Sequence, residues 1–127
     1  FLEPNPRYAP LARIALEGIE NGRWRGATST ITLMEITTRP WQLGREMVAR
    51  EYEAILARFP NLSIVDIDRN VARRAAQLRA KFNLLPADAL QVAASLIAGA
   101  KAFLTNDKRL SKLHEVMDVL VLDDFLA

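Results

Sequence analysis

Three carboxylates stand alone among apolar residues at separate points of the sequence. Glu35 is the one charge within residues 31–36, Asp88 lies in the first turn of an otherwise apolar helix predicted at 86–98, and Asp107 lies in the turn after an apolar strand. For Glu35 and Asp88 the argument is burial, because a buried carboxylate without a partner is too costly to keep. For Asp107 it is position, because parallel sheets bind ligands beyond the carboxyl ends of their strands. Because oxygen ligands favour hard cations, the three acids together predict a shared Mg²⁺ or Mn²⁺ site.

Each of these acids also has an ordinary structural explanation. Glu35 can face solvent, Asp88 can stabilise the positive end of a helix dipole, and Asp107 can form an Asx turn or cap a helix. Ser29 and Thr105 adjoin the proposed cluster in the sequence. They are either polar supports of the acids or capping and turn hydroxyls.

The elements that must position these acids alternate between helices and short strands. Apolar residues at helical spacing predict helices over residues 8–21, 29–39, 44–59, 68–83 and 86–98, with a short one at 108–113. Arg39-Pro40 is expected to end the second helix. Apolar runs predict strands at 62–67, 102–105 and 119–122. Uniformly apolar strands between helices are typical of a parallel sheet covered on both faces, so we predict an α/β protein built as a three-layer α/β/α sandwich.

The composition limits both the size and the chemistry of the protein. With 127 residues, half of them hydrophobic, we expect a single domain spanning residues 1–127. No run approaches the roughly 18 apolar residues of a membrane span and no leader is recognisable, so we expect a cytoplasmic protein without a membrane partner. The lack of cysteine excludes thiolate metal sites and a Cys nucleophile. The single histidine, His114, lacks the partners of a Ser-His-Asp triad.

Arginines far outnumber the four lysines, although the formal net charge is only +2. Guanidinium groups suit phosphate contacts because they bind phosphate oxygens through two parallel hydrogen bonds. A GC-rich genome would give the same bias on solvated helix faces. Charge alone therefore does not establish a nucleic-acid partner.

Three segments resemble motifs of the PIN domains, in particular of the VapC-type toxins of type II toxin-antitoxin systems. They are Thr-Ile-Thr-Leu-Met-Glu at 30–35, Leu-Pro-Ala-Asp-Ala-Leu at 85–90 and Leu-Thr-Asn-Asp-Lys-Arg-Leu at 104–110. In that family such segments supply the second, third and fourth acids of a catalytic quartet, so the resemblance assigns those roles to Glu35, Asp88 and Asp107. The first acid lies on an opening strand of the type Asp-Thr-Ser. We expect that strand to precede Phe1, which would leave the domain incomplete at its N-terminus.

The resemblance implies a metal-dependent ribonuclease that hydrolyses RNA phosphodiester bonds with Mg²⁺ or Mn²⁺ held by the carboxylates. It also implies a homodimer and a cognate VapB-type antitoxin that lays a peptide across the acidic site. Two alternatives stay open: a non-catalytic PIN-like module that binds RNA, and a receiver-like Mg²⁺-binding signalling domain. A receiver needs paired acids after its first strand and a Lys after its fifth, and the sequence shows no such set.

Overall fold

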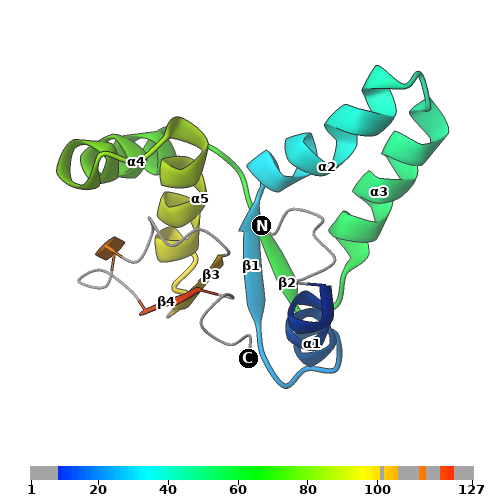
Figure 1. The fold of residues 1–127 in the computed structure, drawn as a ribbon, viewed down its shortest axis with the longest axis horizontal. Coiled ribbons are helices and arrows are strands. Elements are labelled where there is room, and N and C mark those ends of the chain that lie inside the picture. Colours follow the sequence, from blue (N-terminus) through cyan, green and yellow to red (C-terminus); the bar gives the residue numbers. More distant parts are fainter. Residues whose placement is uncertain (1–8, 101, 106–111, 114–117, 122–127) are drawn as a thin grey trace.

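The computed structural model describes residues 9–100, 102–105, 112–113 and 118–121 (Figure 1). In chain order, the helices and strands are α1 (Ala9–Glu20), β1 (Gly26–Ser29), α2 (Thr30–Gln42), α3 (Glu46–Arg58), β2 (Leu62–Val65), α4 (Arg69–Phe82), α5 (Pro86–Ile97), β3 (Ala102–Thr105) and β4 (Asp118–Val121). The predicted mixture of helices and short parallel strands is confirmed. None of the helices in these ranges is long and apolar enough to cross a membrane.

The strands of the described residues form two parallel pairs. β1 pairs with β2, with Ser29 opposite Val65 at the carboxyl ends, and β3 pairs with β4, with Thr105 opposite Val121. Within the described part of the chain, each pair is a separate two-stranded sheet. β3 has its predicted bounds, whereas β2 ends two residues earlier than expected and β4 begins one residue earlier.

Helices cover both faces of β1. A Cβ atom added to Gly26 would lie 2.7 Å from Cδ1 of Ile19, so this side of the strand lies against α1. Ser29, three residues further along, faces the other way and bonds Gln91 of α5. Successive strand side chains point to opposite faces, and α1 and α5 lie on opposite sides of β1 in Figure 1. The α/β/α layering predicted from the sequence is therefore present at β1.

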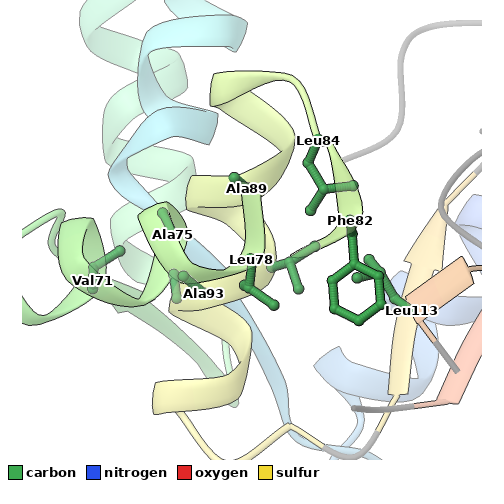
Figure 2. Close-up of a cluster of buried hydrophobic side chains, with 10 residues drawn as sticks. Val71, Ala75, Leu78, Phe82, Leu84, Ala89, Ala93 and Leu113 are labelled. Atoms are coloured by element: carbon green, nitrogen blue, oxygen red, sulfur yellow. The ribbon is translucent and has the colours of Figure 1, made fainter. Parts of the chain in front are cut away.

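A cluster of buried apolar side chains is formed mainly by α4 and α5 (Figure 2). Its members are Val71, Ala75, Leu78, Phe82, Leu84, Ala89, Val92, Ala93, Ala94 and Leu113. Local signals set the ends of these helices as predicted: the Asp68 carboxylate accepts a hydrogen bond from the Val71 amide at 2.9 Å, Asn83 ends α4 in the left-handed conformation, and Pro86 begins α5. The expectation that α5 is mostly buried is confirmed.

Two features near α2 differ from the prediction. The strand β1 is not evident from its sequence, because Gly-Ala-Thr-Ser contains no large apolar residue and pairing with β2 decides its conformation. The expected helix end at Arg39 was wrong, since α2 continues through Pro40 to Gln42. Proline lacks the N–H donor of a helical hydrogen bond. Helical hydrogen bonding is present again at Leu43, whose amide donates to the Arg39 carbonyl at 3.1 Å.

The helices α2 and α3 pack against each other but leave many large apolar side chains exposed. The exposed set on and between them comprises Met34, Trp41, Leu43, Met47, Tyr52 and Ile55. Met47, at 81% exposure, is the most open of these. The apolar face predicted for residues 44–59 is thus only partly used, and Ala49 is the one buried residue of α3.

Candidate functional site

The carboxyl end of β1 leads directly into α2. Ser29 is both the last residue of the strand and the N-cap of the helix, and its Oγ accepts a hydrogen bond from the Ile31 amide at 3.1 Å. Its side chain is fully buried. A capping hydroxyl satisfies one of the free donors at a helix start, so the strand end fixes where α2 begins and which residues follow on each of its faces.

A buried glutamine of α5 joins that helix to the start of α2. Ser29 Oγ donates to Gln91 Oε1 at 2.7 Å, and Gln91 Nε2 donates to Thr32 Oγ1 at 2.9 Å and to Glu35 Oε1 at 3.3 Å. Thr32 Oγ1 is also 2.7 Å from Thr28 Oγ1. No buried polar side-chain atom within the described ranges is left without a partner. This polar network therefore crosses the α2–α5 contact at no cost in unsatisfied groups.

Glu35 lies at the outer end of this network. Glu35 is an exposed residue, and the buried residues of α2 are Thr32, Thr37 and Pro40. Of the two interpretations of Glu35 that the sequence allowed, the solvent-facing position is the one observed. Thr37 can be buried because its hydroxyl donates a hydrogen bond to the Leu33 carbonyl at 2.6 Å within the helix. The Glu35 side chain nevertheless contacts α5 through Gln91.

Asp88 lies in the first turn of α5 and is partly buried. It precedes Gln91 by three residues, and helix residues three apart are neighbours on one face. Glu35 is thus hydrogen-bonded to a side chain one turn along α5 from Asp88. The negative charge of Asp88 is also favoured there by the helix dipole. Two acids that are far apart in the sequence are brought to the same region of the α2–α5 contact.

The third predicted acid, Asp107, falls outside the described residues, as does His114. Thr105 ends β3, and the structure describes its backbone pairing but not its side chain. No group of three or more His, Asp or Glu side chains able to hold a metal ion occurs among the residues that are described. The convergence of all three acids stays a prediction.

The donor set of Glu35 and Asp88 nonetheless fits a hard divalent cation. Both offer carboxylate oxygens, and the sequence has no cysteine to favour a softer metal. Gln91 was not predicted as part of the site, although it and Ser95 are the only polar side chains after the first turn of α5. An isolated amide within an alanine-rich buried helix was the available signal, since a buried amide must find partners.

Comparisons with known proteins identify the family of the chain. The family model for the PIN domain matches residues 7–116 of the chain. A solved toxin-antitoxin complex from Klebsiella pneumoniae contains a similar chain, with a TM-score of 0.62 and 22% sequence identity, covering 87% of this chain and 82% of that one. A search of curated proteins gave no significant match. Since the family model spans most of the sequence, the receiver-like alternative is not supported, and the chain belongs to the PIN domain family.

Proposed function

We propose that this protein is a metal-dependent ribonuclease and the toxin component of a VapBC-type toxin-antitoxin system. The observation that carries the proposal is the link from Glu35 through Gln91 to the helix turn that bears Asp88, in a chain of the PIN family. Nuclease activity is the general property of that family, and the structural similarity to a toxin-antitoxin complex supports the biological role.

In this proposal Glu35, Asp88 and Asp107 hold one or two Mg²⁺ or Mn²⁺ ions through their carboxylate oxygens. Such an ion, when bound, makes a water molecule more acidic and offsets negative charge on the phosphoryl group. The chain's own residues supply the placement: Ser29 fixes the start of α2, and Gln91 holds the Glu35 carboxylate against α5. Exposed arginines, such as Arg69 and Arg73 at the start of α4, would hold the RNA backbone.

Cleavage of total RNA by the full-length protein, with cut sites mapped, tests this function. We expect cleavage in Mg²⁺ or Mn²⁺ and none in excess chelator. The cleavage rate should fall by more than about 100-fold in each of Glu35→Gln, Asp88→Asn and Asp107→Asn. Loss of a residue that only supports a metal ligand costs at most about 100-fold, so a larger loss is expected for a ligand itself. Glu53→Gln is a matched control, because Glu53 is an exposed acid on α3.

The results separate the nuclease from its main alternative. Cleavage that persists in chelator would reject the metal-dependent mechanism. RNA binding without any cleavage would favour the non-catalytic PIN-like module. Equal activity of Asp88→Asn and Glu53→Gln would remove Asp88 from the site.

We further propose two protein partners, a second copy of the chain and an antitoxin peptide. A basic antitoxin side chain placed between the carboxylates would take the position of the metal charge, which is a direct way to inhibit the site. Light scattering of the purified protein tests the homodimer. Competition between the co-purified antitoxin and Mn²⁺ for the toxin tests the second partner, and independent binding of the two would contradict this mode of inhibition.

A further inference from the structure

The hydrogen bonds around the Gln91 amide use both of its ends. Its oxygen accepts from Ser29 Oγ at 2.7 Å, and its nitrogen donates to Thr32 Oγ1 at 2.9 Å and to Glu35 Oε1 at 3.3 Å. A primary amide has two N–H groups, so both have acceptors here. Gln91 is 8% exposed and belongs to a well-packed part of α5, whereas Glu35 is on the surface. A buried donor in a packed helix thus meets the carboxylate of an exposed side chain.

The orientation of this amide follows from its neighbours. Ser29 Oγ already accepts the Ile31 amide proton, and it directs its own single proton to Gln91 Oε1. Turning the amide over would place its oxygen 3.3 Å from Glu35 Oε1, where two acceptors would face each other without a proton between them. The strand end of β1 therefore determines, through Ser29, that Gln91 presents N–H to Glu35.

We infer that Gln91 is a positioning residue that holds the Glu35 carboxylate beside the first turn of α5 and so prepares the Glu35–Asp88 pair for a divalent cation. This inference rests on the proposed metal-dependent function. Gln91 does not bind the ion itself in this account. Its N–H occupies one oxygen of Glu35 and leaves the other available, in the manner of residues that orient metal ligands from behind.

The principal test is Mn²⁺ affinity, measured by electron paramagnetic resonance without RNA, for wild type and Gln91→Met. Methionine has a similar shape but no N–H, and we expect Mn²⁺ to bind about 10- to 100-fold more weakly. Ser95→Ala is the matched control, because Ser95 is equally buried on α5. Its hydroxyl donates to the backbone carbonyl of Gln91 and not to the side-chain amide. The Mn²⁺ affinity of Ser95→Ala should stay within about twofold of wild type, because this substitution leaves the hydrogen bond between Gln91 and Glu35 in place.

A double-mutant cycle distinguishes positioning from a general effect on folding. If Gln91 acts through Glu35, then Gln91→Met should cause little further loss of Mn²⁺ affinity in a Glu35→Gln background. Full additivity of the two losses would overturn the inference. Unchanged Mn²⁺ affinity of Gln91→Met, with wild type binding normally, would overturn it while leaving the ribonuclease proposal intact. Failure of wild type to bind Mn²⁺ or to cleave RNA would instead reject the proposed function.

A second measurement does not alter Gln91 at all. The side-chain NH₂ resonances of Gln91 should shift as Mg²⁺ is added to the wild-type protein, and they should also shift in the Glu35→Gln variant, since both change the charge of their acceptor. The Mg²⁺ midpoint should equal that of thermal stabilisation by the same ion. Resonances that do not move in either experiment would contradict the inference even if Gln91→Met fails to fold.

Discussion

Glu35 and Asp88 differ in how firmly the fold holds them. Glu35 is exposed and is bonded to α5 by one amide, whereas Asp88 is partly buried within the first turn of its helix. A long, exposed side chain pays more conformational entropy when it is ordered than a short one does. Asp88 is therefore the more rigid of the two acids, and its substitution gives the cleaner test of the site.

We predict that Asp88→Asn abolishes RNA cleavage but leaves the metal-free protein at least as stable as wild type. Asparagine keeps the shape and removes one of the two negative charges that we propose to share the metal ion. Because Glu35 is exposed and screened by solvent, the gain should stay below about 1 kcal/mol. Wild type should gain about 2.7 kcal/mol from metal at a hundredfold excess over its dissociation constant, and the variant should gain less.

Thermal unfolding of both proteins, in chelator and in Mg²⁺, measures these differences alongside an RNA cleavage assay. Glu53→Gln again serves as the control, because it removes an exposed acid on another helix. Equal stabilisation of Asp88→Asn and wild type by Mg²⁺ would place the ion elsewhere. Cleavage of RNA by Asp88→Asn at the wild-type rate would show that the reaction does not require the Asp88 carboxylate.

The sequence made the acids visible but not their relationship. Glu35 and Asp88 stand out because a lone charge in an apolar segment needs a partner. Gln91 does not stand out as a partner of Glu35, because the two are separated by 56 residues and only the packing of α2 on α5 joins them. Nor could the sequence show that Glu35 is exposed, since that depends on which face of α2 the rest of the fold covers.

At the scale of helices and strands, most of the buried apolar side chains among the described residues belong to α4, α5 and the turn between them. Leu78 is 2% exposed there, while Met47 on α3 is 81% exposed. We predict that Leu78→Ala lowers the free energy of unfolding by about 2 to 5 kcal/mol, because it leaves a cavity as well as losing apolar burial. Met47→Ala should change it by no more than about 0.5 kcal/mol.

Urea unfolding of the two variants measures both values. A low protein concentration keeps self-association through exposed apolar residues small. A loss of more than about 2 kcal/mol in Met47→Ala, beyond the usual range of surface substitutions, would show that α3 is covered in solution. A small effect of Leu78→Ala would mean that the core is not between α4 and α5.

The ends of α4, which local signals set, were predicted well, whereas β1 and the end of α2 were not. The start of α4 follows from the Asp68 cap and its end from Asn83, and both are encoded within a few residues. By contrast, β1 is a strand because β2 lies beside it. The helix α2 continues through Pro40, because a proline this close to the helix end removes only one hydrogen bond.

At the scale of the whole molecule, the excess of arginine over lysine has a measurable consequence if the partner is RNA. The net charge of +2 is too small for strong long-range attraction, so binding should depend on local arginine contacts with phosphates. We predict that RNA affinity of the inactive Asp88→Asn variant falls with salt, each phosphate contact contributing about −0.7 to the slope of log K against log salt concentration. An affinity that is independent of salt would contradict phosphate binding.

The network around Gln91 also bears on the order in which the protein folds. Ser29 and Gln91 are 62 residues apart, so their hydrogen bond closes a long loop that encloses α2, α3, β2 and α4. Contacts between residues so far apart form only after the chain has lost much of its freedom. During synthesis, β1 and α2 leave the ribosome well before α5, and Glu35 has no donor from α5 until then. A nascent chain would therefore carry its acids apart, and the pair would be assembled only as folding is completed.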